Sequence, residues 1–396
     1  MWPNNVRTVV ALALDSFRIF VLNPILELIK KKYPWLFSFN LWLCLCLGLY
    51  LIGALFNFGI YHWDELFQTI EPAATKLGLS RFDELPWEFS QKVRPWLQIW
   101  LYYFLAFLTQ SWWVENRFIL GSVCQVFNGL MFALCFSFFL KQLFDFKKHP
   151  FFYFLILSFY SVVFFAVRSS SESLSSSFFF WGLSLLLSMM SLPKTWFWVG
   201  ILFGLSFQAR YQMGIPISFV GLWLLVLKEQ RSWRLWLWMA LGFVLTQIFG
   251  QVLNRLGYGV WILPELNYFV ANIVQGVASQ FGVSPYYGYV NELSSFLGWP
   301  FTLILGLCFI YCCIRYWREV WIWIALPHLF IHSAIPHKEL RFLMPVLALI
   351  PVYWVVAGLD FSKYLSETFP NSRVQKVFLL LFSTHFAFFS VMGWSN

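Results

Sequence analysis

Two short groups of ionisable residues interrupt an otherwise apolar chain. The first is "HWDELFQ" (62–68), in which Asp64 and Glu65 directly follow the apolar run "LWLCLCLGLYLIGALFNFGIY". The second is "HKELRF" (337–342), which compresses four ionisable groups between two apolar runs. A lone charge at a helix end usually snorkels or caps. Because charges bordering a hydrocarbon phase are costly, two such clusters are candidates for a functional site.

The residue types in these clusters suit proton transfer and anion binding. A carboxylate at a lipid–water boundary has its charged form disfavoured by desolvation, which raises its pKa and lets it accept a proton from a hydroxyl. Arginine binds a phosphate through a bidentate fork and lysine as a point charge. Together these groups suit transfer from a lipid-linked phosphate to a hydroxyl. They also suit a proton-coupled transporter, so the residue chemistry leaves both classes open.

The composition defines the elements that must position these groups. The 396 residues are 60% hydrophobic, 22% aromatic and 11% charged, and the mean hydropathy is +0.68. Such a chain is typical of an all-α integral membrane protein. The net charge of +9 fits cationic loops beside membrane spans better than nucleic-acid binding. The seven cysteines lack histidines at zinc-ligand spacing, so we expect free thiols, no metal and no cofactor.

Apolar runs of about 20 residues predict the membrane spans. We expect about eleven transmembrane helices, of which those at 98–112 and 320–335 are short and that at 196–226 is long enough to be tilted or broken. Their predicted ranges are 39–60, 98–112, 118–140, 151–168, 174–192, 196–226, 235–253, 295–314, 320–335, 343–358 and 376–392.

Basic residues between the spans predict the orientation. "KKK" at 30–32 and the lysines and arginines at 228–234, 315–318 and 363–376 belong inside by the positive-inside rule. Residues 1–38 then form a cytoplasmic amphipathic segment. Three segments fall on the outer or luminal side. They are the first polar segment (61–97), which we expect to form short amphipathic helices, the second polar segment (254–294), and the stretch 336–342, which contains the signature segment (337–342).

Four stretches resemble motifs of one enzyme family, in the same order. "HWDELFQTIEPA" resembles the "HPDE-x-x-Q-x-x-EPAH" start of the first luminal loop of the family 22 glycosyltransferases, and "LPWEFSQKVRPWL" resembles the "TWEW…IRS" stretch that closes it. "LPELNYFVANIVQGVASQFGVSPYYGY" is similar to "P-x-NF-x-x-FN…G-x-S-x-x-YG-x-HPW-x-W-Y", and "HKELRF" fits "HKE-x-RF" without a mismatch. These relatives are mannosyltransferases that use dolichyl-phosphate-mannose to build N-glycan precursors and GPI anchors.

The resemblance implies a GT-C fold with its active site at the outer membrane surface. It implies that Asp64 is the catalytic base, taking the acceptor hydroxyl's proton as that oxygen attacks the anomeric carbon of the sugar. The transfer would invert the configuration without a metal. The resemblance also implies that matching positions contact substrate or shape the cleft. These positions are His62, Glu65, Gln68, Glu71, Trp87, Glu88, Arg94, Tyr286, Tyr287, His337, Lys338, Glu339 and Arg341.

Within that set, the roles differ. His337, Lys338 and Arg341 are expected to engage the donor phosphate or sugar, whereas Glu339 either joins them or pairs with Arg341 or Lys338. Tyr286 and Tyr287, in "PYYGY" where the family has "HPWHWY", either line the sugar site or anchor the chain at the interface.

The chain also departs from the family pattern. Trp63 replaces the usual proline, and "VRSSSESL" (167–174) matches "RT-x-SNS-x-E" only at Arg168 and Glu172. These differences point to a divergent, bacterial-type member that uses a polyprenyl-phosphate sugar.

Two functions therefore compete. The favoured one is a glycosyltransferase that moves a hexose from a polyprenyl- or dolichyl-phosphate donor to a glycolipid or lipid-linked glycan acceptor, with mannose as the preferred candidate for the hexose. It would lie in the plasma membrane of a bacterium or the endoplasmic reticulum membrane of a eukaryote. The alternative is a transporter or flippase of a lipid-linked sugar. A transporter would carry ionisable residues near mid-span and often repeated halves, whereas here the charges cluster at one side and no repeat is visible.

Overall fold

The computed structural model describes residues 39–56, 60–116, 118–144 and 150–369. The predicted segment 1–38 and the predicted span 376–392 lie outside this part. Within it the regular structure is helical, and no strand is found among these residues. The all-helical class predicted from composition is thus confirmed.

The helices are of very unequal length. In chain order the first nine are α3 (Phe39–Phe56), α4 (Glu71–Lys76), α5 (Trp87–Ser90), α6 (Leu97–Leu108), α7 (Gln110–Trp113), α8 (Phe118–Leu143), α9 (Pro150–Ser158), α10 (Tyr160–Ala166) and α11 (Ser171–Ser188). The rest are α12 (Pro193–Ala209), α13 (Gly214–Val226), α14 (Trp233–Tyr258), α15 (Pro264–Phe269), α16 (Gly288–Leu297), α17 (Trp299–Arg315), α18 (Val320–Ala334) and α19 (Met344–Thr368).

Four stretches are long and apolar enough to cross a membrane: Phe39–Phe56, Phe118–Leu143, Trp233–Tyr258 and Leu340–Thr368. Shorter apolar helices accompany them at Leu97–Leu108, Tyr211–Val226, Trp299–Arg315 and Val320–Ala334. Large apolar side chains such as Leu237, Ile248 and Leu256 are more than half exposed along α14. This outward apolar surface fits an integral membrane protein, although the predicted count of eleven spans is not established.

Two predicted spans are each divided in the structure. The run 151–168 becomes α9 and α10, which meet at Phe159. The run 196–226 becomes α12 and α13, separated by a short 3-10 turn at Tyr211–Met213. The second break follows Arg210, whose backbone is extended and whose side chain is buried. A break was one of the outcomes expected of a run this long, and it lets the buried Arg210 leave the helix and reach its partners.

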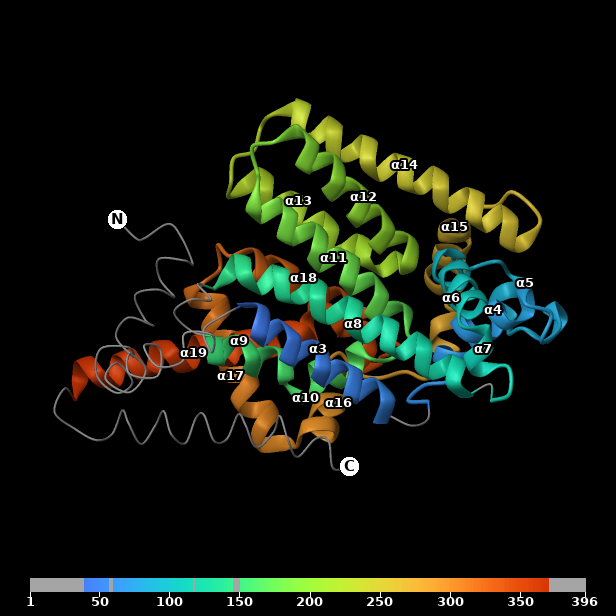
Figure 1. The fold of residues 1–396 in the computed structure, drawn as a ribbon. Helices are drawn as coiled ribbons and strands as arrows, with labels where there is room; N and C mark the ends of the chain where they lie inside the picture. The colour runs from blue at the N-terminus through green and yellow to red at the C-terminus, as the bar shows by residue number, and fades with distance from the viewer. Residues whose placement is uncertain (1–38, 57–59, 117, 145–149, 370–396) are drawn as a thin grey trace.

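Glycines allow α12 and α14 to pack in close contact. A Cβ atom on Gly200 would lie 2.0 Å from the carbonyl oxygen of Met239, and one on Gly242 would lie 2.2 Å from that of Phe197. Small residues that let two backbones approach are the usual means of helix association in membranes. In Figure 1 these two helices run side by side above α11.

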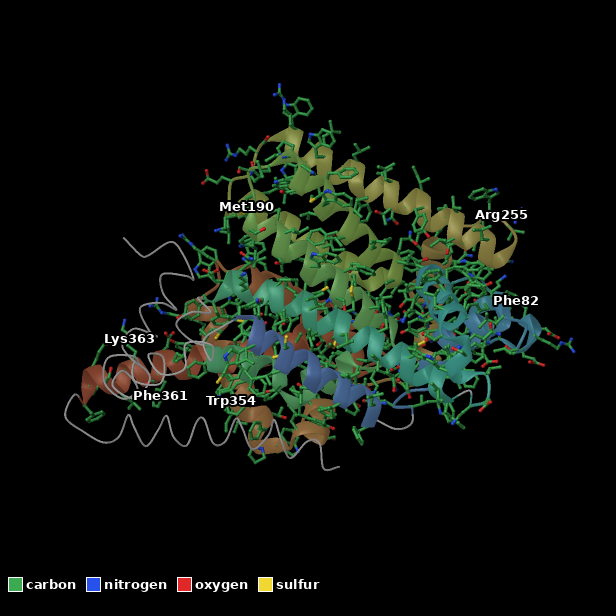
Figure 2. The ribbon with its side chains drawn as sticks, viewed as in Figure 1. Phe82, Met190, Arg255, Trp354, Phe361 and Lys363 are labelled. Atoms are coloured by element: carbon green, nitrogen blue, oxygen red, sulfur yellow. The ribbon has the colours of Figure 1, made fainter. Side chains whose placement is uncertain are left out.

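The short helices gather at one end of the molecule. In Figure 1, α4, α5, α6 and α15 lie together at the right, whereas α19 extends to the left. Figure 2 shows Phe82 and Arg255 at that right end and Met190 and Lys363 toward the left. The first polar segment indeed forms short helices, α4 and α5 and a 3-10 turn at Phe82–Glu84. Which side of a membrane this end faces stays a prediction.

Candidate active site

Asp64 is the first residue of the helical stretch that precedes α4 in the first polar segment. The backbone N–H of Glu65 donates to the carbonyl of His62 at 3.0 Å, and that of Leu66 donates to Trp63 at 3.1 Å. Residues Leu66–Ile70 then form a π-helical turn, a feature frequent at functional sites. A carboxylate in the first turn is favoured there, because the unpaired N–H groups carry partial positive charge.

Arg341 joins the two clusters that the sequence singles out. Its Nη2 donates to Asp64 Oδ2 at 2.5 Å, across 277 residues of sequence. Its Nε donates to Glu339 Oε2, and its Nη1 lies 3.9 Å from Glu172 Oε1. The Arg341 side chain is 4% exposed and that of Asp64 is 24% exposed. Arg341 therefore holds three carboxylates, and Asp64 is the one that solvent or substrate reaches most easily.

Two histidines flank Glu339. His337 Nε2 lies 2.7 Å from Glu339 Oε1, and His62 Nε2 lies 3.5 Å from Glu339 Oε2. The backbone nitrogen of Asp64 lies 3.2 Å from His62 Nδ1. His62 Nδ1 also lies 3.5 Å from Asp64 Oδ1. His62 thus ties the start of the first polar segment to the signature segment.

The pKa values of Asp64 and Glu65 shift in opposite directions, whereas the sequence predicts a raised pKa for a carboxylate at this boundary. Burial acts to raise the pKa of Asp64, but hydrogen bonding from His62 and the charge of Arg341 outweigh it and hold that pKa well below its usual range. Burial raises the pKa of Glu65, which is 2% exposed. The prediction that desolvation makes the carboxylate a stronger base was thus wrong for Asp64, because its hydrogen bonding and its ion pair with Arg341 outweigh the effect of burial on its pKa.

This shift gives a testable pH dependence. A carboxylate base is active when ionised, so the rate falls only as the pH drops through its pKa. Because the pKa of Asp64 lies below its usual value of 3.8, we expect no acid limb from Asp64 between about pH 7 and pH 5. The measurement is kcat/KM across this range for the sugar transfer that the sequence predicts. A carboxylate limb near neutral pH in the wild type, absent from Asp64→Asn, would contradict the assignment of this ion pair.

Gln68, Glu88 and Arg94 form a separate network within the first polar segment. Gln68 Nε2 donates to Glu88 Oε1 at 2.9 Å, and Arg94 Nη2 donates to the same oxygen at 2.7 Å. Gln68 and Glu88 are 6% and 9% exposed. This network holds the two ends of the segment together, one helical turn from Asp64.

Aromatic contacts connect all three segments. The Trp87 ring stacks on Phe281 with centroids 6.2 Å apart, and Phe281 packs against His337 at 6.2 Å. Lys338 Nζ donates to the backbone carbonyls of Ser284 at 3.0 Å and Ile335 at 2.8 Å. Lys338 was expected to bind the sugar donor. In the structure, two of the three N–H groups of its ammonium bond to backbone carbonyls, and the bond to Ser284 holds the second polar segment against the signature segment.

The other predicted residues lie outside this cluster. Glu71 opens α4 with its side chain partly exposed, and it makes no ion pair with any described residue. Tyr286 and Tyr287 are 52% and 62% exposed, and Tyr286 packs edge-on against the exposed ring of Phe330 at 5.8 Å. These positions match the interface-anchoring alternative, while a sugar contact for either tyrosine stays a prediction.

Arg210 is a member of the cluster that sequence reasoning missed. Its Nη2 lies 3.0 Å from Glu172 Oε1, and both Arg210 and Arg341 lie over the Phe342 ring, at 5.4 Å and 5.2 Å. Glu172 was only a partial family match. The available signal for Arg210 was its position inside an apolar run, since a charge there implies a buried partner.

The geometry suits handling of a proton and an anion near a polar, partly buried carboxylate. Asp64 is exposed enough to accept a proton from an incoming hydroxyl, and Glu65 lies behind it, accepting the backbone N–H of His62 at 3.2 Å. In the part of the chain that the structure describes, no group of three or more histidine, cysteine or acidic side chains is arranged to hold a metal ion.

Comparison with known proteins supplies a family. A profile of the Alg9-like mannosyltransferase family matches residues 41–395. The matched range covers nearly all of the chain, including Asp64, Glu172, Arg210 and the signature segment.

Individual relatives match over shorter stretches. The chain is 30% identical over 142 residues to GPI alpha-1,2-mannosyltransferase 3 of Bos taurus, covering 35% of this chain and 25% of that protein. The same enzyme of Mus musculus is 29% identical over 168 residues, covering 41% and 29%. A probable Dol-P-Man:Man(7)GlcNAc(2)-PP-Dol alpha-1,6-mannosyltransferase of Schizosaccharomyces pombe is 38% identical over 88 residues, covering 22% and 16%. The matched parts thus span less than a third of these relatives.

Proposed function

The chain belongs to the Alg9-like mannosyltransferase family. From this premise we propose that it transfers a hexose from a polyprenyl-phosphate donor to a hydroxyl of a lipid-linked or surface glycan, with mannose as the preferred candidate for the sugar. The observation that carries the proposal is the Asp64 carboxylate. It is partly exposed at the junction of three segments and held by Arg341. The names of the relatives, which include Dol-P-Man-dependent enzymes, support the donor class.

Asp64 is the base in the proposed mechanism. The acceptor oxygen attacks the anomeric carbon, the bond from that carbon to the phosphate oxygen breaks, and the acceptor's proton passes to Asp64. A β-linked donor then gives an α-linked product by inversion. The low pKa of Asp64 is compatible with this role, because attack turns the hydroxyl into an oxonium that is far more acidic than any carboxylic acid. The proton is therefore transferred late, as the new bond forms.

An apolar cavity supports a lipid-linked donor. It has a volume of about 550 Å³ and lies between α16, α17, α18 and α19, with Tyr289, Leu340 and Leu343 among its lining residues. Leu303 and Leu307 on its wall are 64% and 60% exposed, so the cavity opens sideways, where lipid would be. Since Leu340 is adjacent to both Glu339 and Arg341, a polyprenyl chain lying there would bring its phosphate to the signature segment.

The proposal includes the GT-C architecture and an outer or luminal active site. The polar segments meet at one end of the helices, and the basic loop that follows α13 and the C-terminal end of α19 lie toward the other, where Figure 2 shows Lys363. This separation of charge supports the orientation predicted by the positive-inside rule.

The test is a transfer assay with the purified full chain. Polyprenyl-phosphate-mannose labelled in the sugar is supplied with extracted glycolipids, and a labelled product with a new glycosidic bond is the expected result. In liposomes, movement of the labelled donor between leaflets without a new bond would instead identify the flippase alternative.

A change in the apolar cavity should separate recognition of the lipid from recognition of the sugar. Gly306 in α17 lines the cavity, and a Cβ added there meets nothing within 4 Å. A leucine at this position would fill part of the space, and its Cβ would meet no neighbouring atom. We expect Gly306→Leu to raise the KM for a long-chain polyprenyl donor at least about fivefold, since a few displaced methylenes are worth roughly 1 kcal/mol, and to affect a ten-carbon donor less.

Gly48→Leu is the matched control for this variant. Gly48 also meets nothing within 4 Å but lies in α3, away from the cavity lining. Its donor KM should equal that of the wild type. Equal effects of the two variants, or an effect of Gly306→Leu independent of chain length, would remove the cavity from the donor site.

A further inference from the structure

A second, polar pocket lies between the first polar segment and the end of α12, and it shares no lining residue with the apolar cavity. Its lining includes Gln68, Arg94, Gln98, Arg210, Tyr211 and Tyr268. Gln68 lies one turn after Asp64, and Arg210 reaches the same Glu172 that Arg341 faces. The pocket has a volume of about 20 Å³, which is room for one group the size of a water molecule.

Three of the lining residues each carry a buried polar atom that has no hydrogen-bond partner among the described residues. These atoms are Arg94 Nε, Gln98 Oε1 and the Tyr211 hydroxyl. A buried polar group without a partner costs about 1–3 kcal/mol, so native proteins rarely leave three around one space. Such a group is most readily explained by a molecule that supplies the missing hydrogen bonds.

The surrounding contacts fix which atoms are available. Gln98 Nε2 donates to the Tyr102 hydroxyl at 2.9 Å and faces the carbonyls of Ser169 and Ser170 at 3.4 Å and 3.3 Å. These acceptors require the amide nitrogen on that side, so the free atom of Gln98 is its oxygen. The pocket therefore offers one acceptor from Gln98, one donor from Arg94, and a Tyr211 hydroxyl that can do either.

Charge decides between an anion and a neutral ligand. The two arginines that line the pocket are already paired, Arg94 with Glu88 at 2.7 Å and Arg210 with Glu172 at 3.0 Å. The lining is thus close to neutral, and it presents a free acceptor that would repel a phosphate oxygen. A hydroxyl, which donates one hydrogen bond and accepts others, matches both the charge and the mixed donors and acceptors.

We propose that this pocket binds one hydroxyl group of a hexose substrate and determines which sugar the enzyme accepts. The inference rests on the proposed function and adds to it a site for sugar recognition. The hydroxyl belongs either to the transferred sugar or to the accepting sugar, and these two sources are told apart by separate binding measurements. Because a site built to hydrogen-bond a hydroxyl strongly rejects the analogue that lacks it, Tyr211 and Gln98 are specificity-determining residues.

The test compares binding of two labelled ligands to the purified full chain. They are tritiated polyprenyl-phosphate-mannose and tritiated octyl α-mannoside, each measured by scintillation proximity. Tyr211→Phe removes only the hydroxyl and should weaken one of the two ligands by about 5- to 30-fold. Arg94→Lys keeps the charge beside Glu88 but removes Nε–H, and it should weaken the same ligand.

Deoxy analogues of the affected ligand identify the hydroxyl. The analogue that lacks it should bind the wild type as poorly as the intact ligand binds Tyr211→Phe, and the variant should show no further loss. Tyr103→Phe is the control, since Tyr103 lies outside the pocket lining and should bind both ligands like the wild type.

The folding of the variant provides an independent readout. Tyr211→Phe deletes a buried hydroxyl that has no described partner, so its unfolding temperature should equal or exceed that of the wild type. A drop in stability with unchanged binding would give Tyr211 a structural role and overturn the proposal, as would affinities for both ligands within twofold of the wild type. A wild-type protein that binds neither ligand would overturn the proposed function as well.

Discussion

Asp64→Asn should lower the rate of sugar transfer by about 100- to 10,000-fold, the range that general-base catalysis contributes. The amide cannot take the proton of the acceptor hydroxyl, but it keeps the size and most of the hydrogen-bonding geometry of the carboxylate. Donor affinity should change little, because the carboxylate accepts its proton only as the new bond forms. The measurements are kcat and donor Kd for the purified variant.

Three companion variants separate chemistry from folding in this prediction. Asp83→Asn removes a carboxylate that pairs with Arg81 at 2.7 Å on an exposed turn, with side chains 65% and 74% exposed, and should leave kcat unchanged. Glu65→Gln should lower the rate far less than Asp64→Asn, since Glu65 is buried behind it. Asp64→Glu should recover only part of the activity, because a longer side chain displaces the carboxylate. Turnover that persists in Asp64→Asn, or a larger loss in Glu65→Gln, would transfer the role of base to Glu65.

The contrast between Asp64 and Glu65 illustrates what the sequence could not determine. Both acids stand at the same boundary, so desolvation alone predicts raised pKa values for both. The structure distinguishes them, since Asp64 receives Arg341 from 277 residues away while Glu65 turns inward. A pKa depends on partners in space, and a partner so distant in sequence leaves no local pattern to read.

The elements were predicted more reliably than their boundaries. Helical class, the short helices of the first polar segment, and the family resemblance are confirmed, the last by the match over residues 41–395. The length of the run 196–226 allowed for a break but did not place it at Arg210, because the apolar residues on either side outweigh one cation in a hydropathy average. A window-based reading cannot see that Arg210 must leave the helix to meet Glu172.

The signature segment was found from sequence, and the expected alternative of a Glu339–Arg341 pair is observed, while donor contacts by its cations stay a prediction. Lys338 and Arg341 were expected to engage the donor. In the structure, Lys338 is bound to two backbone carbonyls and Arg341 to carboxylates. A short motif shows that certain residue types are needed together. It does not show whether a cation faces a ligand or the protein's own acids, which depends on elements such as α11 that are remote in sequence.

Arg341→Gln tests that distinction, and it should have the largest effect on folding. The Arg341 side chain is 4% exposed and is shared by Asp64, Glu339 and Glu172. Removing one member of a buried ion network typically costs about 3–5 kcal/mol, because the remaining charges stay buried without a partner. We therefore expect a clear fall in the unfolding temperature in detergent together with loss of transfer. Arg81→Gln, which breaks the exposed pair with Asp83, should cost no more than about 1 kcal/mol.

A double variant shows whether the loss comes from unpaired carboxylates. If Arg341 acts mainly by neutralising them, Asp64→Asn should restore part of the stability of Arg341→Gln, since one buried negative charge is then gone. It should restore no activity, because the base is also gone.

The pH dependence of stability should differ between the wild type and Arg341→Gln, because Glu339 keeps its arginine partner only in the wild type. Burial opposes the negative charge of Glu339, but Arg341 outweighs it and holds the pKa of that carboxyl below its usual value. The wild type therefore keeps this stabilisation above about pH 4 and loses it as the pH falls further, whereas Arg341→Gln should lose stability as the pH rises. An Arg341→Gln protein as stable as Arg81→Gln, but with a weakened Kd for polyprenyl phosphate, would instead assign Arg341 to the donor phosphate.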